Sequence, residues 1–195
     1  MQHADLPGIL AFLRAAEALK TATRSGWTTA GQPESVAEHT WRLCLMALVL
    51  HHGFPEVDFA RLIRICIVHD LGEAIGGDVP APEQALRPEG KAADERRDLL
   101  RLLAPLPPAQ RDEITALWDE YEAASTPEAR LAKGLDKLET ILQHTQGANP
   151  PDFDYRFNLG YGRRYTEGHP MLEALRALLD QETERRARER DDARE

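Results

Sequence analysis

The hydrophobic positions along the chain recur with the spacing of an α-helix almost from end to end. In the N-terminal segment they fall at Ile9, Phe12, Leu13, Ala16 and Leu19. This spacing places them on one helical face and predicts a helix over Leu6 to Thr21. The same periodicity, together with N-caps, closing glycines and prolines in first turns, predicts further helices over Ser35 to about His51, Val57 to Leu71, Gly90 to Leu103, Pro108 to Ala123, Pro127 to about Thr145, and from Met171 onward.

Between these helices, glycine and proline predict loops. The loops lie at 26–33, at 80–88, in QGANPPDF and in YGRRYTEGHP. No alternation typical of β-strands and no internal repeat is present, so the sequence predicts a single compact all-α domain, a helical bundle. We expect this domain to cover residues 1–178, with its core at about 35–145. Residues 179–195 form a charged tail without an apolar stripe, which we expect to be a frayed helix or disordered.

Length and composition narrow the class of protein. A chain of 195 residues can bury a core without metal or disulfide staples. The longest apolar run, Leu43 to Leu50, is too short to span a membrane, and the N-terminus lacks the pattern of a signal peptide, so we expect a cytoplasmic protein without membrane contact. Cys44 and Cys66 lie in apolar runs, where a reduced thiol packs as a small hydrophobe. The net charge of −9 argues against long nucleic acid as a partner but allows a small anion.

Candidate chemistry concentrates in the stretch RICIVHDLGEAIGGDVP. It ends a mostly apolar segment in His69 and Asp70, and Glu73 and Asp78 follow shortly afterwards. Because the segment is apolar nearly all round, we expect its helix to be central, with His69 and Asp70 at the buried end. One helix earlier, His39 shares a face with apolar residues and therefore points toward the core.

Neighbouring buried carboxylates need a positive partner. A divalent cation satisfies that need, and imidazole together with carboxylate suits Mn, Fe, Co, Ni or Zn. A structural zinc site built from thiolates is excluded, because neither cysteine is placed to join the cluster. The same residue types also form hydrogen-bonded structural networks, and the spacing alone leaves both interpretations open.

Four segments carry a resemblance to a known family. They are PESVAEHTWR, IVHDLGEAIGGDVPAP, LWDEYEAAST and LDKLETILQ. In this order and with these separations they resemble the HD-domain phosphohydrolases, most closely the branch of metal-dependent 5′-deoxynucleotidases. The similarity extends over most of the chain, from ATRSGW to the GHP before the last helix. It implies an all-α fold, commonly a homodimer, that removes phosphate from deoxynucleoside 5′-monophosphates.

The resemblance also implies a metal site. The residues that match the family's ligands are His39, His69, Asp70 and Asp136. They would hold one divalent ion, with Mn, Co or Mg expected first and Zn, Ni or Fe as alternatives. From the pattern alone, Asp136 would be an exposed partner of Lys133, three residues away, and the resemblance reverses that interpretation.

Proton transfer and part of the nucleotide contact are implied at the end of the HD segment. The resemblance assigns Glu73 to proton handling at the leaving 5′-oxygen, and Asp78 to positioning the sugar or sharing the proton role. From the residues alone, Glu73 is equally a hydrogen-bond partner of a ligand histidine, and Asp78 a turn residue after two glycines. The matching segment that contacts nucleotide consists of Asp78, Val79, Pro80 and Ala81.

Arg24 resembles the family arginine that orients the substrate phosphate, and Trp27 is placed to pack against the nucleoside. A guanidinium suits this role because it binds two phosphate oxygens at once. The sequence departs from the family pattern nearby, since the loop from Trp27 to Glu34 is about two residues shorter and lacks the second arginine expected there. Alternatively, Arg24 is an exposed charge at a helix C-terminus. Arg163 and Arg164 are weaker candidates for the phosphate.

Two other functions compete with the deoxynucleotidase. One is an HD hydrolase of another phosphoester, such as a deoxynucleoside triphosphate or a cyclic nucleotide. The other is a non-catalytic helical scaffold whose acidic cluster is structural. The chain has every residue that matches the family's metal ligands, and also Glu73 and Asp78, which argues against the scaffold. Four other histidines lie near predicted helix ends, and we assign no chemistry to them: His51, His52, His144 and His169.

Overall fold

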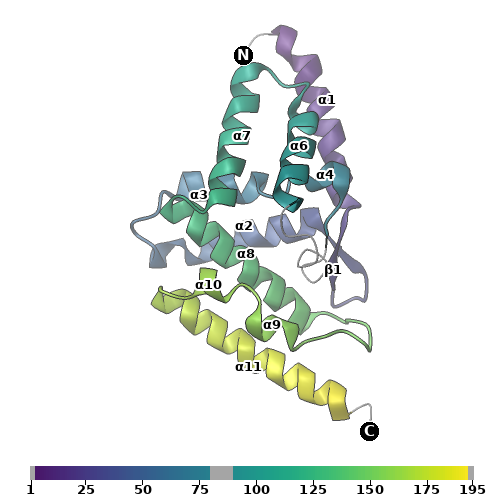
Figure 1. Cartoon of the computed structure of the whole chain (residues 1–195), viewed down its shortest axis with the longest axis vertical. Helices are drawn as coiled ribbons and strands as arrows, with labels where there is room; N and C mark the ends of the chain where they lie inside the picture. The colour runs from purple at the N-terminus through teal and green to yellow at the C-terminus, as the bar shows by residue number, and fades with distance from the viewer. Residues whose placement is uncertain (1–2, 80–89, 193–195) are drawn as a thin grey trace.

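The computed structural model describes residues 3–79 and 90–192, and these are helical almost throughout (Figure 1). In chain order the elements are η1 (His3–Asp5), α1 (Leu6–Ala16), η2 (Glu17–Lys20), β1 (Thr23–Trp27), β2 (Pro33–Ser35), α2 (Val36–Leu50), η3 (His51–Gly53), α3 (Phe59–Val68), α4 (Glu73–Gly76), α6 (Lys91–Leu103), α7 (Pro108–Ala123), α8 (Pro127–Gln146), α9 (Phe157–Gly160), α10 (Arg163–Thr166) and α11 (Pro170–Asp192). The all-α prediction is confirmed, and the long helices lie within a few residues of their predicted bounds. The irregular stretch predicted at 80–88 lies outside the described residues.

Helix α8 runs through the middle of the fold. It packs against α2, α3 and α7, and also against α10 and α11 (Figure 1). Leu135, Leu138 and Ile141 of this helix are completely buried. Its N-terminus is set by Thr126, whose hydroxyl accepts a hydrogen bond from the Ala129 backbone N–H at 3.1 Å. Because α8 is surrounded, a polar side chain on it that faces inward is held by neighbours on several helices.

Helix α3 is less central than its composition predicts. It buries Leu62, Ile65 and Cys66, but Ile67 on its outer face is 51% exposed. The difference arises because α3 packs against α2, α7 and α8 on one side only. His69, directly after α3, is nevertheless buried at 3% exposure, as expected for the end of this helix.

The segment predicted as a loop before α2 contains a β-hairpin, which the sequence analysis missed. Strands β1 and β2 pair antiparallel, with Thr23 opposite Ser35. Gly31 closes the turn with a φ of +76°, a conformation that favours glycine. Ser35 then begins α2 with the predicted capping box, since the Glu38 backbone N–H donates to its hydroxyl at 3.2 Å. The hairpin therefore fixes β1, and with it Arg24, beside the start of α2.

The C-terminal part of the chain is more regular than predicted. Residues 179–192 continue α11 as helix, and Leu179, Thr183 and Ala187 are buried along one face of it. This face was not recognised because a threonine and an alanine form most of it. Short helices α9 and α10 occupy the region around the predicted YGRRYTEGHP loop. The domain boundary at residue 178 stays a prediction.

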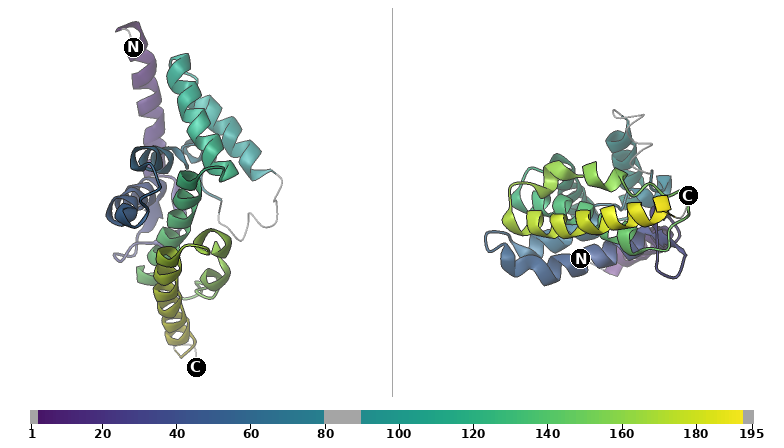
Figure 2. Two further views of the ribbon diagram at one scale, coloured as in Figure 1. Left: turned by 90° about the vertical axis from the view of Figure 1, so that its left-hand side faces the viewer. Right: turned by 90° about the horizontal axis from the view of Figure 1, so that it is seen from below.

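The molecule is elongated, and its termini lie toward opposite ends of the long axis (Figure 2). Helices α1, α6 and α7 extend at one end, and α11 lies across the other. Both cysteines are free, as predicted for residues that pack. Within residues 3–79 and 90–192, no helix combines the length and the apolar character needed to cross a membrane.

Candidate metal centre

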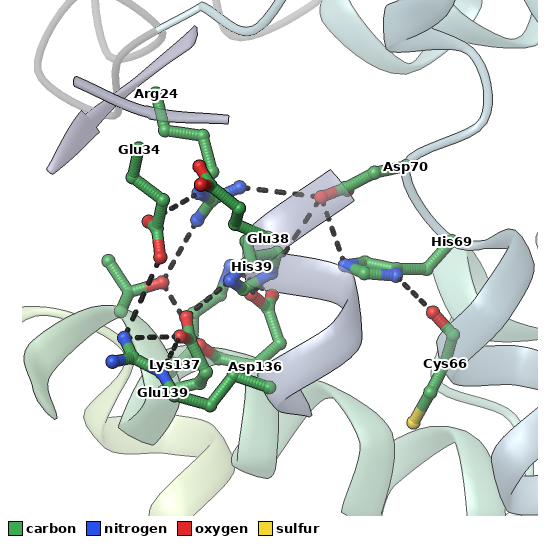
Figure 3. Close-up of polar contacts among 12 residues, drawn as sticks. Arg24, Glu34, Glu38, His39, Cys66, His69, Asp70, Asp136, Lys137 and Glu139 are labelled. Carbon is green, nitrogen blue, oxygen red and sulfur yellow. Dashed lines mark hydrogen bonds and ion pairs between the residues drawn. The ribbon is translucent and has the colours of Figure 1, made fainter. Parts of the chain in front are cut away.

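The four residues predicted as metal ligands come together from three places in the chain. His39 comes from α2, His69 and Asp70 follow α3, and Asp136 comes from α8 (Figure 3). The Nε2 atom of His39 lies 3.3 Å from Asp136 Oδ1 and 3.7 Å from Asp70 Oδ2. The Nε2 atom of His69 lies 3.1 Å from the same Asp70 oxygen. Two imidazole nitrogens and two carboxylate groups thus face one another.

Both histidines present the same ring nitrogen to this point. The Nδ1 atom of His69 lies 2.8 Å from the Cys66 backbone carbonyl, which can only accept, so Nδ1 carries the proton. The Nδ1 atom of His39 contacts a carboxylate oxygen of Glu139. The two Nε2 atoms are buried and have no hydrogen-bond partner among the described residues. In the neutral ring, the lone pair of each Nε2 is therefore oriented for an electrophile, and His39 must lose a proton to reach that state.

Glu139 and Arg42 support His39 from behind and were missed by the sequence analysis. Glu139 is completely buried and contacts His39 Nδ1 (Figure 3). Arg42 donates from Nε to Glu139 Oε1 at 2.6 Å, and its Nη2 lies 2.5 Å from the same oxygen as an ion pair. A carboxylate on the far nitrogen of a histidine fixes the tautomer and orientation that a metal ligand needs. Glu34 lies next to this pair, 3.6 Å from Arg42 Nη2.

One carboxylate oxygen of Asp136 accepts hydrogen bonds, and the other faces His39. Its Oδ2 accepts hydrogen bonds from the Tyr121 hydroxyl at 2.7 Å and from Lys137 Nζ at 2.8 Å. The alternative of an exposed pair with Lys133 is wrong, because Asp136 is 4% exposed and Lys133 pairs with Glu122 instead. Oδ1 is the oxygen that faces His39.

Charges around the cluster set its protonation. Burial opposes ionisation of Asp70, but His69, Arg24 and His39 hold its pKa well below the usual range. Burial and Arg24 oppose protonation of His39, but Glu139 and Asp136 outweigh them and raise its pKa to about 9. The site therefore contains ionised carboxylates beside a histidine that a cation must deprotonate to bind.

The donor set fits a divalent cation. Imidazole nitrogen and carboxylate oxygen are the ligands of transition-metal hydrolytic centres. Four protein donors would leave two positions of a six-coordinate ion open for solvent and substrate. His39, His69 and Asp70 place their ligand atoms within 4.8 Å of one another. The two Nε2 atoms lie 3.3 Å and 3.1 Å from carboxylate oxygens without a well-formed hydrogen bond, an arrangement that a shared cation would satisfy.

The cluster lies against a cavity of about 750 Å³. His69, Asp70 and Asp136 line it, and so does Arg24. Arg24 is not an exposed surface charge, since its side chain is 11% exposed. Its Nη1 donates to Asp70 Oδ2 at 3.3 Å, and its Nη2 donates to the Thr140 hydroxyl at 3.0 Å. The structure thus places a guanidinium directly beside the predicted metal ligands.

Glu73 and Asp78 line the same cavity. Glu73 is 4% exposed, and its Oε2 has no hydrogen-bond partner within the described segments, so the alternative of a bond to a ligand histidine is not found. Burial, followed by the charges of Asp70 and Asp78, raises the pKa of Glu73 to about 10. Burial also raises the pKa of Asp78. The residue before it, Gly77, has a φ of +75°. A neutral carboxylic acid thus lies beside ionised carboxylates.

The other predicted nucleotide contacts fare differently. Trp27 lies off the cavity wall formed by the described residues, because β1 ends there and packs its backbone against α8, with Gln143 donating to the Trp27 carbonyl. Val79 is exposed at 39%, and its contact with substrate stays a prediction. Pro80 and Ala81 lie outside the described residues.

Further residues of the C-terminal half complete the cavity, and among them Arg164 had been a candidate from the sequence. Arg164 lines the cavity, whereas Arg163 donates to Asp180 on α11 at 3.2 Å. His144, to which no chemistry was assigned, is buried with Nδ1 2.9 Å from Asn158 Oδ1, and burial lowers its pKa to about 4. Lys133 and Lys137 also line the cavity.

A comparison with protein families matches the HD domain over residues 16–176. The chain belongs to the HD domain family. It is 38% identical over 141 residues to the 5′-deoxynucleotidase HDDC2 of Mus musculus, covering 71% of this chain and 69% of that protein. It is 36% identical over 149 residues to the 5′-deoxynucleotidase hdd1 of Schizosaccharomyces pombe, covering 73% of this chain and 74% of that protein.

A solved structure of similar fold supports the same family. The crystal structure of a predicted metal-dependent phosphohydrolase from Magnetospirillum magnetotacticum matches with a TM-score of 0.80 and 32% identity. The match covers 93% of this chain and 94% of that one. Members of the HD domain family are metal-dependent phosphohydrolases, which agrees with the donor set of this chain.

Proposed function

We propose that this protein is a metal-dependent 5′-deoxynucleotidase, which hydrolyses deoxynucleoside 5′-monophosphates to deoxynucleosides and phosphate. The observation that carries the proposal is the pair of buried, unpartnered Nε2 atoms of His39 and His69, which face Asp70 and Asp136 at a cavity beside Arg24. Similarity to proteins named as 5′-deoxynucleotidases supports the choice of substrate class.

His39, His69, Asp70 and Asp136 would hold the metal ion. When bound, a divalent ion lowers the pKa of water and offsets the negative charge that gathers on phosphorus. Glu139 orients His39, and the Cys66 carbonyl orients His69, so each Nε2 is ready to coordinate. We propose Mn, Co or Mg as the physiological ion, with Zn, Ni or Fe as alternatives.

Arg24 would bind the phosphate group. Its guanidinium is fixed between Asp70 and the Thr140 hydroxyl, so it approaches the phosphate without losing side-chain freedom on binding. Glu73 would donate the proton that the departing 5′-oxygen needs, because burial favours its protonated form. Asp78 would position the deoxyribose or share that proton.

Phosphate release from a substrate panel tests the proposal. Metal-stripped protein is reloaded with Mn, Co or Mg and supplied with deoxy- and ribonucleoside 5′-monophosphates, deoxynucleoside triphosphates and cyclic nucleotides. We expect metal-dependent release from the deoxynucleoside monophosphates, which is lost in His69→Ala and retained in His52→Ala, a change at an exposed histidine. Release only from triphosphates or cyclic nucleotides would move the function to another phosphoester, and no release with metal bound would refute hydrolysis.

We also propose that the chain forms a homodimer through the exposed face of α2. Apolar side chains gather on this face at Trp41, Leu45, Leu48 and Val49. Trp41 and Val49 are 66% and 67% exposed, and a contiguous exposed apolar patch of this kind marks an interaction surface. Light scattering should give twice the chain mass of 21.9 kDa, and Trp41→Glu should give the monomer mass. A wild-type mass of one chain would refute the dimer.

A further inference from the structure

Besides Tyr121, four aromatic side chains line the same cavity as the metal centre, and the proposed phosphate chemistry does not use them. We call them the aromatic wall, which consists of Phe153, Phe157, Tyr161 and Tyr165. All four come from the segment between α8 and α11, and each is half-buried. Within this segment α9 packs against α11, and α10 packs against α8 (Figure 1).

The backbone that carries the wall is held in place by a buried arginine of α11. Arg176 is 5% exposed and donates from Nη2 to the Asn158 carbonyl at 2.7 Å and from Nη1 to the Tyr161 carbonyl at 2.7 Å. The Asn158 side chain is completely buried and contacts His144 of α8. The wall is therefore ordered before any ligand arrives, which lowers the entropic cost of binding.

Lys137 connects the aromatic wall to the metal centre. Its Nζ donates to Asp136 Oδ2 at 2.8 Å and lies 5.1 Å from the centre of the Tyr161 ring. Gly162 permits this closeness, because it has a φ of +67° and a Cβ there would lie 2.5 Å from Lys137 Cγ. The wall thus begins within one side chain of a residue proposed to hold the metal.

Three rings of the wall already have partners: Lys137 lies 5.1 Å from the centre of the Tyr161 ring, Arg164 lies 4.5 Å from that of Tyr165, and Phe153 contacts His144 edge-on. Tyr161 packs partly against the core, whereas Phe157 is not among the described residues that do so. Their ring centroids are 5.4 Å apart with planes inclined by 34°. Phe157, by contrast, lines the cavity outside the core, and such a ring favours a flat aromatic ligand, because stacking buries apolar area on both partners. In a nucleotide, the group with this chemistry is the base.

We propose that the aromatic wall binds the nucleobase of the substrate by stacking. This inference rests on the proposed function, because it concerns the base of the same nucleotide whose phosphate Arg24 binds. Every base has a π-face, so stacking accepts all bases, and purines bind more tightly than pyrimidines because their rings bury more area. Phe157 is thus a residue that determines substrate affinity rather than the rate of the chemical step.

Kinetics of Phe157→Ala with two substrates test this inference. The substrates are dAMP and 2-deoxyribose 5-phosphate, which has the same phosphate and sugar but no base. For dAMP we expect KM to rise about tenfold with kcat nearly unchanged, since stacking is lost only from binding. For 2-deoxyribose 5-phosphate we expect no change, and Phe157→Trp should restore the KM for dAMP. An unchanged KM for dAMP, or equal losses on both substrates, would overturn the inference.

A binding measurement separates this inference from the proposed function. Calorimetry with metal-stripped protein measures the affinity for deoxyadenosine, which carries no phosphate and needs no hydrolysis. We expect Phe157→Ala to bind about tenfold more weakly than the wild type at an unchanged unfolding temperature. Equal affinities would overturn the base site. If the binding difference is found but no nucleotide is hydrolysed, the base site stands and the deoxynucleotidase proposal fails.

Discussion

The Nδ1 atom of His39 contacts the carboxylate of Glu139, and both side chains are completely buried. The contact joins α2 to α8 in the interior and turns the other ring nitrogen of His39 toward Asp136 and Asp70. A buried carboxylate also needs charge compensation, which Arg42 provides. The position of one proposed metal ligand thus depends on Glu139 and Arg42, two residues outside the proposed ligand set.

Replacing Glu139 with glutamine should weaken metal binding by about 10- to 100-fold. The amide no longer selects the His39 tautomer with a free Nε2, and the ligand loses basicity. Competition of metal-stripped protein with a chelator measures the affinity. Glu120→Gln is the matched control, because Glu120 is also buried and paired with an arginine, Arg61, but lies away from the cavity. Equal affinities of Glu139→Gln and wild type would contradict this role.

Metal affinity should rise with pH until about pH 9. Glu139 and Asp136 overcome burial and raise the pKa of His39 from 6.5 to about 9, so metal must displace a proton at neutral pH. Below pH 9 we expect the apparent affinity to increase about tenfold per pH unit, and above it to level off. Calorimetry in buffers of different ionisation enthalpy should report release of a proton on binding at pH 7. A pH-independent affinity would contradict the assignment.

The same raised pKa makes a separate contribution to stability without metal. Protonated His39 stabilises the folded chain, and this contribution is fully present below pH 6.5 and lost as the pH rises through about 9. Metal-stripped protein should therefore lose free energy of unfolding in that window, while His39→Gln should lose less. Urea unfolding across the range measures the difference, and identical profiles for the two proteins would count against it.

Glu73→Gln should lower kcat for dAMP by about 10²- to 10⁴-fold, because the variant cannot donate a proton to the leaving oxygen. A substrate whose leaving group needs no proton, p-nitrophenyl phosphate, should lose far less. Metal content measured in the same samples shows whether the site remains loaded. If both substrates lose activity equally with metal bound, Glu73 acts in some other way.

The long helices could be predicted because their signals are local. Ser35 with Glu38 marked the start of α2, and the prolines at the starts of α7 and α8 marked those helices to the residue. The same kind of signal placed His39 inward and His69 at a buried helix end. Asp136 needed the family resemblance, because a charged residue beside an apolar stripe has the same local pattern whether buried or exposed.

The supporting residues could not be predicted, because their contacts join distant parts of the chain. Glu139 lies 100 residues from His39 and 97 from Arg42. The β-hairpin depends on pairing across a turn, and its strands are too short for a visible alternation. The aromatic wall was likewise hidden, because its residues extend from the predicted loop QGANPPDF into the Gly-rich loop YGRRYTEGHP.

The central position of α8 can be tested by a pair of apolar truncations. Leu138→Ala should lower the free energy of unfolding by about 2–5 kcal/mol, because Leu138 is completely buried. Ile67→Ala on the outer face of α3 should lower it much less, because Ile67 is 51% exposed. Chemical denaturation gives both values. Similar losses would mean that α3, and not α8 alone, is surrounded by the core.

The central claim is that one divalent ion, held by His39, His69, Asp70 and Asp136, enables hydrolysis of deoxynucleoside 5′-monophosphates. The most direct measurement is phosphate release from dAMP while metal-stripped protein is titrated with Mn²⁺. We predict that the rate rises in proportion to added metal and stops rising at one equivalent per chain, with no rate in Asp136→Asn at the same concentrations. Full activity in stripped protein that retains no metal, or an undiminished rate in Asp136→Asn, would contradict the claim.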